Sequence, residues 1–198
     1  MNVVRLVKRA KKGNKDALLQ LITAEQDAYY RLALTYMGND HDAMDAMEDM
    51  IVTLYEKMDQ LQNAQAFYSW SKTILVNSCK GLLRKRSKLV LVDEWEMGAN
   101  RQRPGQDTDR GKVMVSPFPI HPAAVDDSYL RSEQQIDIQS LFQHINEQQR
   151  EAIQLKYFHD LDYQSISDIT QVSIGTVKSR IHQGLKKLKE HYGGDRNE

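Results

Sequence analysis

Apolar residues recur at helical spacing along most of this chain. The first predicted helix ends before Gly13-Asn14. Its apolar positions are Val3, Val4, Leu6, Val7 and Ala10. A second helix is predicted from Asp16 to Tyr36 and a third from His41 to Leu61, since apolar side chains three and four residues apart share one helix face. No segment carries a convincing strand pattern, and the sequence contains no repeat.

The middle of the chain changes character twice. A basic helical segment runs from Gln62 to Lys88, and the helical period then disappears between Leu89 and Asp127. The second stretch holds all four prolines of the chain together with several glycines. Such a composition is typical of a flexible linker.

Helical spacing resumes in the last third, with predicted helices from Tyr129 to Ile145 and from Glu147 to Phe158. The stretch from Asp162 to Glu190 then predicts two helices joined by a tight turn, a helix-turn-helix. The Ser173 hydroxyl is suited to cap the second of these helices. One narrow apolar stripe follows the cap: Ile174, Val177, Ile181, Leu185 and Leu188.

These elements predict an all-α protein of two small helical domains joined by a flexible linker. The first domain covers residues 1–88 as a helical bundle, and the linker covers 89–127. The helix-turn-helix domain covers 128–192 and a short tail covers 193–198.

Charge is segregated along the chain although the formal net charge is zero. The helix from His41 to Leu61 has one cation, Lys57, against these carboxylates: Asp42, Asp45, Glu48, Asp49, Glu56 and Asp59. Methionines in the same helix would suit either core packing or an adaptable partner surface. Both interpretations, a solvated acidic face and a docking face, remain open at this point.

The segment from Gln62 to Lys88 contains no carboxylate and carries aromatic residues near its start. Its cations could hold phosphates, and its rings could stack on bases. The alternative is that Phe67, Trp70 and Ile74, which share one helix face, are core. We expect Trp70 to be core, and Phe67 and Tyr68 to be the better candidates for binding.

The last helix presents a carboxylate-free polar arc opposite its apolar stripe. Hydrogen-bonding and cationic residues form this arc and its flanks: Thr176, Ser179, Arg180, His182, Gln183, Lys186 and Lys187. Such side chains suit a helix in the DNA major groove. An ordinary amphipathic surface helix would show a similar arc.

Other classes of function find little support. The single cysteine, Cys79, excludes an internal disulfide and a thiolate metal cluster. No apolar run approaches the ~20 residues of a membrane helix, and the N-terminus does not resemble a signal peptide, so a cytoplasmic protein is expected. Because the sequence lacks a glycine-rich phosphate loop, a His pair at ligand spacing and a nucleophile–base arrangement, we expect no enzyme, no metal and no cofactor.

The order of these segments resembles a bacterial sigma factor of the small extracytoplasmic-function (ECF) type. Asp42-Ala-Met-Asp45-Ala-Met-Glu48-Asp49 is similar to the D-A-x-D-x-x-Q-E polymerase-binding segment of that family. Phe67-Tyr-Ser-Trp70 through Ile74-Leu-Val-Asn77 is similar to its F-x-x-W-L-x-x-I-A-x-N promoter-melting segment. Leu161-Asp-Tyr-Gln-Ser-Ile166 and Ile174-Gly175-Thr176-Val177-Lys178-Ser179-Arg180 are similar to its fourth-region motifs. The resemblance covers the chain outside the linker and identifies the two domains as sigma regions 2 and 4.

The resemblance implies core RNA polymerase and promoter DNA as partners. It implies polymerase binding by one set of residues: Asp42, Met44, Asp45, Glu48, Asp49 and Ile51. It implies recognition and melting of the minus-ten element by a second set: Phe67, Tyr68, Asn77, Lys80, Arg84, Lys85 and Arg86. Within that set, Asn77 and Phe67 are implied to hold one flipped base together with the loop Asp59–Ala66. It implies recognition of the minus-thirty-five element by a third: Thr176, Lys178, Ser179, Arg180, His182 and Gln183.

Two further expectations follow. Many members of the family are held by an inhibitory anti-sigma factor, so the resemblance implies such a partner. The competing hypothesis is an autonomous helix-turn-helix regulator, which would bind duplex sites without polymerase. That hypothesis leaves the carboxylate-free aromatic helix of the first domain unexplained.

Overall fold

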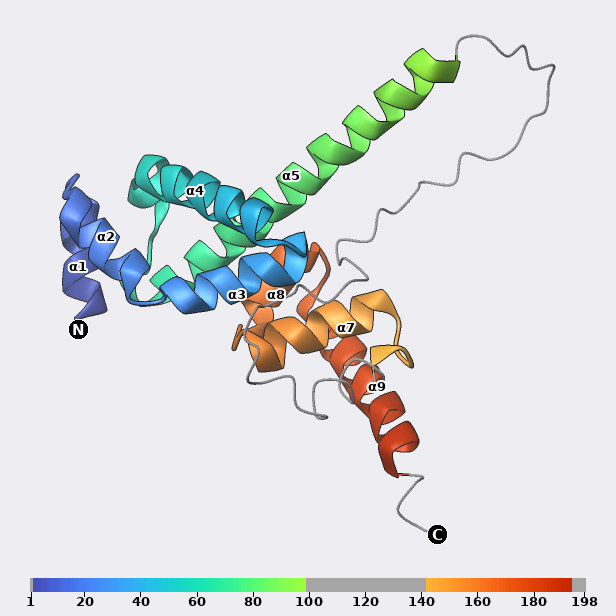
Figure 1. The fold of residues 1–198 in the computed structure, drawn as a ribbon. Helices are drawn as coiled ribbons and strands as arrows, with labels where there is room; N and C mark the ends of the chain where they lie inside the picture. The colour runs from blue at the N-terminus through green and yellow to red at the C-terminus, as the bar shows by residue number, and fades with distance from the viewer. Residues whose placement is uncertain (1, 99–141, 194–198) are drawn as a thin grey trace, which may run out of the picture.

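The computed structural model describes residues 2–98 and 142–193, and all of the regular elements in these residues are helices (Figure 1). The side chains of 87–98 and 192–193 are not described. Within these ranges the chain has the predicted all-α fold.

The N-terminal helices are short and capped by asparagines. Helix α1 (Val3–Ala10) begins after Asn2, and α2 (Lys15–Thr23) begins after Asn14, whose side chain accepts a hydrogen bond from the Ala17 amide. The turn between them contains Gly13 at φ +85°, a left-handed conformation that favours glycine. The two helices pack against each other.

The single helix predicted from Asp16 to Tyr36 is wrong in one respect. The chain leaves helical geometry at Glu25, with φ −122° and ψ 18°, and α3 (Gln26–Met37) starts there. The break redirects the chain, so that α2 packs on α1 while α3 packs on the next two helices. Gly38 ends α3 at φ +77°.

Helices α3, α4 (Asp40–Lys57) and α5 (Phe67–Gly98) form the core of the N-terminal module. Large side chains from all three helices are fully buried: Tyr29, Leu32, Tyr36, Met50, Leu54, Phe67 and Leu75. Between α4 and α5 the chain makes two 3₁₀ turns, η1 (Met58–Gln60) and η2 (Ala64–Ala66).

Helix α5 continues ten residues beyond Lys88, the last residue that the sequence analysis placed before the linker. The physical reason is visible in the sequence, because no proline or glycine interrupts the chain between Gly81 and Gly98. The rest of the predicted linker and most of the predicted helix Tyr129–Ile145 lie outside the described residues.

The C-terminal module contains the predicted helix-turn-helix. Asn146 and Gln149 form a reciprocal capping box at the start of α7 (Glu147–Ile153), which continues as a π-helical turn, η3 (Gln154–Phe158). Helix α8 (Tyr163–Thr170) ends at Gln171, whose φ of +56° turns the chain toward α9 (Ile174–Gly193). The Ser173 hydroxyl accepts a hydrogen bond of 3.2 Å from the Thr176 amide, which confirms the predicted cap.

The two modules pack directly against each other, with α7 and α8 beside α3 and α5 (Figure 1). Their buried apolar side chains form one continuous cluster. Polar side chains also bond across this contact, and one of them, Lys80, is a candidate DNA-binding residue.

Candidate nucleic-acid and protein interfaces

Helix α4 presents an exposed face that is both acidic and apolar. Asp45, Glu48 and Asp49 are exposed, and they are interleaved with Met44 and Ile51, which are 48% and 38% exposed. The other side of α4 is buried in the module. An exposed face that combines carboxylates with large apolar side chains suits a protein partner better than it suits solvent alone.

Two residues that the sequence analysis did not assign to a site extend this face. Val52 and Tyr55 are 57% and 52% exposed. The signal was present in the sequence, because the apolar band of this helix is too wide to be buried on one side. Burial of Met50 and Leu54 leaves the opposite edge of that band in solvent.

Asp42 was predicted to contact polymerase, but its carboxylate is committed within the module. The residue is only 4% exposed. Both carboxylate oxygens accept hydrogen bonds from the Arg86 guanidinium, and Oδ2 also accepts one of 2.6 Å from the Asn39 amide. Asn39 in turn caps α4 through the Asp42 amide. Asp42 therefore joins the start of α4 to α5, and its carboxylate is not displayed with those of Asp45 and Asp49.

Phe67 was predicted to be a base-stacking candidate, but it is completely buried. Its ring lies edge-on to Tyr68 and tilted against Trp70, with centroids 5.3 and 6.4 Å away. The sequence analysis expected Trp70 in the core and Phe67 at the binding surface. The structure shows the reverse order of burial, because Phe67 is core while Trp70 is only half-buried. Tyr68 is also half-buried, and its hydroxyl has no hydrogen-bond partner among the described residues.

The remaining minus-ten candidates all lie on α5, but they differ in exposure and in their bonds to other residues. Asn77, Arg84 and Lys85 are exposed. Arg86 is 57% exposed but bonded to Asp42. Lys80 points into the contact between the modules, where its ammonium lies 3.1 Å from Glu151 and donates a 2.9 Å hydrogen bond to the Ile169 carbonyl.

The polar arc of α9 faces solvent as predicted. Five of the six predicted minus-thirty-five residues are exposed: Thr176, Lys178, Ser179, His182 and Gln183. Arg180 is half-buried and donates a 2.8 Å hydrogen bond to Gln148 on α7. The apolar stripe differs from the prediction at Ile174 and Leu185, which are 37% and 39% exposed. Gly184 lies closer to α7, and a Cβ on it would meet Ile153 Cδ1 at 2.7 Å.

Further polar contacts join the two modules. The Tyr36 hydroxyl donates a 3.0 Å hydrogen bond to Glu151, which is 7% exposed. Burial, reinforced by Glu151, raises the pKa of Tyr36 well above its usual value. Nearby, the His159 ring lies 3.3 Å from the Thr35 hydroxyl, and burial with the charges of Lys72 and Arg31 lowers the pKa of His159 to about 4. Sequence reasoning missed Tyr36, Glu151 and His159, because nothing in their local spacing marks a contact between modules.

The described residues offer no group of three or more histidines, cysteines or carboxylates placed to hold a metal ion. In the same part of the chain, none of the helices combines the length and the apolarity needed to cross a bilayer.

Both modules match known family models. Residues 21–89 match sigma-70 region 2, and residues 135–188 match sigma-70 region 4.

Similarity to curated proteins extends over nearly the whole chain. The ECF RNA polymerase sigma factor SigW of Bacillus subtilis is 26% identical over 190 residues, covering 96% of each chain. The RNA polymerase sigma-H factor of Pseudomonas aeruginosa is 25% identical, with 93% of this chain and 90% of that protein covered. The ECF RNA polymerase sigma-E factor of Haemophilus influenzae is 24% identical, with 93% and 92% covered.

Two solved structures share the fold. CnrH, in complex with the cytosolic domain of CnrY, superposes with a TM-score of 0.59 at 17% identity, covering 98% of both chains. The sigma factor RpoE of Bartonella quintana, in complex with the anti-sigma factor NepR, also gives a TM-score of 0.59, at 22% identity over 89% of this chain and 97% of that one.

Proposed function

Because this chain belongs to the ECF subfamily of bacterial RNA polymerase sigma factors, we propose that its three exposed surfaces divide the work of promoter-specific initiation among them. As a sigma factor it binds core RNA polymerase and promoter DNA and directs promoter-specific transcription. The observation that carries the proposal is that α4 exposes an acidic and apolar face, whereas α5 and α9 expose polar and cationic side chains.

The α4 face is the proposed polymerase contact. It comprises the exposed part of the predicted set together with Val52 and Tyr55: Met44, Asp45, Glu48, Asp49, Ile51, Val52 and Tyr55. Carboxylates speed the encounter with a basic partner and set its register, while desolvated apolar side chains supply most of the affinity. In this proposal Asp42 holds α4 on α5, and it acts on polymerase binding only through that position.

Helix α5 and the loop before it form the proposed minus-ten surface. Asn77, Arg84 and Lys85 are exposed for contact with bases and phosphates, and half-buried Tyr68 is the available aromatic ring near the loop. Extraction of a base from the duplex costs a few kcal/mol, so a pocket beside the 59–66 loop must return that energy by stacking and hydrogen bonding. Phe67 supports this surface from inside the core.

The exposed arc of α9 is the proposed minus-thirty-five reader. Thr176, Ser179 and Gln183 offer hydrogen-bonding groups at one-turn intervals, while Lys178 and His182 lie on the flanks. This arrangement suits a recognition helix whose polar side chains reach base edges while neighbouring cations hold phosphates. Arg180 is anchored to Gln148 and would position the helix on α7.

The packed arrangement of the two modules represents a resting state in this proposal. Lys80 cannot reach DNA while it is bonded to Glu151 and Ile169. Promoter binding therefore requires the modules to separate. An anti-sigma factor that binds the packed form would oppose that step, and we propose such an inhibitory partner by analogy with the Bartonella quintana sigma factor.

Sigma factors are transcription initiation factors rather than enzymes. We extend this to the present chain and propose that catalysis resides in the polymerase alone. The proposed site of action is the cytoplasm, where polymerase meets promoter DNA.

Run-off transcription over genomic fragments tests the proposal. Core polymerase plus this protein should start transcripts at discrete promoters, and either component alone should not. Tight footprints by the protein alone, unchanged when polymerase is added, would instead support an autonomous helix-turn-helix regulator.

A further inference from the structure

Helix α1 carries a group of cations that the functions above do not use. The first fifteen residues contain no carboxylate. Leu6, Val7 and Ala10 bury one side of α1, and Arg5, Lys8 and Arg9 occupy the other. Lys12 follows in the turn after the helix. This segment precedes the part of the chain that matches sigma-70 region 2.

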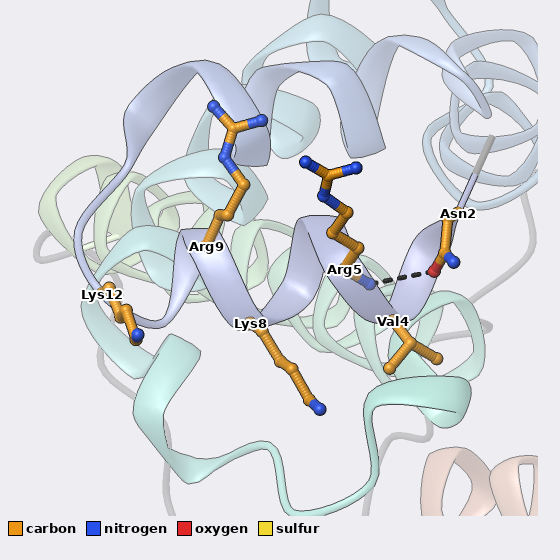
Figure 2. Close-up of a pocket in the computed structure, with 6 residues that line it drawn as sticks. All are labelled: Asn2, Val4, Arg5, Lys8, Arg9 and Lys12. Carbon is orange, nitrogen blue, oxygen red and sulfur yellow. Dashed lines mark hydrogen bonds between the residues drawn. The ribbon is translucent and has the colours of Figure 1, made fainter.

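The four cations line a shallow surface depression together with Asn2 and Val4 (Figure 2). Arg5 and Arg9 lie one turn apart and extend in the same direction. All four cations are exposed, and none of them pairs with a carboxylate among residues 2–86 and 142–191, whose side chains the structure describes. Uncompensated like charges repel each other, so this arrangement favours an external anion.

The patch is attached to the proposed minus-ten surface. Lys11, which follows α1, donates a 2.8 Å hydrogen bond from its ammonium to the Leu61 carbonyl. Helix α1 also packs against η2 (Ala64–Ala66), immediately before α5 starts at Phe67. Any strand held by the 59–66 loop and α5 would therefore pass close to α1.

We propose that Arg5, Lys8, Arg9 and Lys12 form a further promoter-binding site, which holds backbone phosphates beside the minus-ten contact without reading sequence. From Arg5 to the end of α1 at Ala10 the chain advances roughly 7.5 Å at about 1.5 Å per residue, and Lys12 lies just beyond that end. One DNA strand carries a phosphate about every 3.4 Å along the helix axis, so the patch matches about three phosphates. This inference rests on the proposed placement of α5 on minus-ten DNA.

The test uses holoenzyme reconstituted from core polymerase and the full chain, with promoter affinity measured over a range of salt concentrations. Two variants each remove one arginine and one lysine from the patch: Arg5→Gln/Lys8→Gln and Arg9→Gln/Lys12→Gln. The matched control is Arg31→Gln/Lys57→Gln, which removes two exposed cations from α3 and α4, outside both proposed DNA surfaces.

Each phosphate contact contributes about 0.7 to 0.9 to the slope of log affinity against log salt. Each patch variant should therefore lower the magnitude of that slope by about 1 to 2, whereas the control should keep the wild-type slope. This decrease in slope should be equal on promoters with different minus-ten sequences. Arg5→Lys/Arg9→Lys should retain the wild-type slope, because counterion release depends on charge.

Wild-type slopes in both patch variants would overturn the inference. So would weaker association with core polymerase at an unchanged DNA slope, which would assign the patch to an acidic protein partner. If wild-type holoenzyme itself gave no promoter-specific complex, the proposed function would fail instead, so the two failures can be distinguished. Because the substitutions are exposed, matching thermal unfolding curves should show that all variants are folded.

Discussion

The ammonium of Lys80 on α5 lies 3.1 Å from the carboxylate of Glu151 on α7, and the Tyr36 hydroxyl donates to the same carboxylate. Glu151 thus binds two residues of the other module at once. One of them, Lys80, is a proposed promoter contact. The ion pair therefore couples the packing of the two modules to the availability of a DNA-binding residue.

Replacing Glu151 with glutamine should favour separated modules. The substitution leaves the Lys80 charge without its partner in a largely buried place. Loss of one partner of a fully buried pair costs about 3–5 kcal/mol. The Lys80 side chain keeps 21% of its exposure, so the cost should be smaller here. We expect the packed state to lose about 2 kcal/mol relative to the state with separated modules, which is roughly a thirty-fold shift toward separation.

Energy transfer between dyes on Lys57→Cys and Gln164→Cys measures this shift. Burial raises the pKa of the Cys79 thiol to about 12, so the native cysteine should stay unlabelled. Glu190→Gln is the matched control, since Glu190 pairs only with exposed Lys186 on its own helix among the described residues. Equal transfer efficiency in Glu151→Gln and wild type would contradict the prediction.

Reversing two exposed charges on α4 should abolish polymerase binding without unfolding the protein. In Asp45→Arg/Asp49→Arg, like charges would face a basic partner, which costs several kcal/mol. We expect core polymerase association to fall by about 100-fold or more, measured by co-purification and fluorescence anisotropy. Asp16→Arg/Asp27→Arg, which alters exposed carboxylates on α2 and α3, should bind polymerase as wild type does.

Asp42 should behave differently from its neighbours on α4. Asp42→Asn weakens charge-assisted bonds from Arg86 at a buried site, so the free energy of unfolding should fall by about 1–3 kcal/mol. Asp45→Asn, on the exposed face, should change it by less than about 0.5 kcal/mol. Chemical denaturation measures both free energies, and equal stability of the two variants would show that the ion pair between Asp42 and Arg86 does not stabilise the fold.

Acid should loosen the contact between the modules through His159. Burial lowers its folded-state pKa to about 4, so the packed state binds fewer protons than the separated state. The contribution of neutral His159 is fully present above the unfolded value of about 6.5 and is lost as the pH falls toward 4. Lys72, which donates to the His159 carbonyl and pairs with Glu25, and Arg31 both disfavour the protonated ring.

Energy transfer between the modules should therefore decrease from pH 7 to pH 5 in the wild type. His159→Gln removes the titrating ring, so comparison with this variant separates the contribution of His159 from that of other groups. A wild-type titration identical to that of His159→Gln would contradict this role.

Two glycines should respond to alanine in opposite ways. A Cβ on Gly81, within α5, would meet nothing within 4 Å, so Gly81→Ala should stabilise the protein by about 0.5–1 kcal/mol. At Gly184 the new Cβ would lie 2.7 Å from Ile153 Cδ1 and 3.2 Å from Gln149 Cβ, where α9 crosses α7. Steric strain should outweigh the gain in helix propensity and destabilise by about 1 kcal/mol. Thermal unfolding of the two variants tests the difference in sign.

Local features of the sequence predicted the elements well where the determining interactions are local. The Ser173 cap depends on a residue three positions away, and the end of the first helix before Gly13 depends on one left-handed backbone angle. By contrast, the break at Glu25 was missed, because no proline or glycine marks it. Helices α2 and α3, on either side of the break, pack on different partners, and no local pattern encodes that difference.

The candidate surfaces were predicted in outline from charge. Asp45 and Asp49 are displayed as the charge pattern indicated, and so are Ser179 and Gln183 on α9. The pattern could not show which member of each group is buried. The Asp42 carboxylate is not displayed on the α4 face, because it is bonded to Arg86, which is 44 residues further along the chain.

The sequence by itself determined the helical class, the segregation of acidic from basic helices and the family, because periodicity, charge and motif spacing are properties of neighbouring residues. Only the tertiary structure decided that Phe67 is core, that Asp42 is internal and that Lys80 is bound to Glu151. Each of those outcomes depends on which distant side chains pack and form hydrogen bonds at that site with the lowest free energy, and no local pattern encodes that choice.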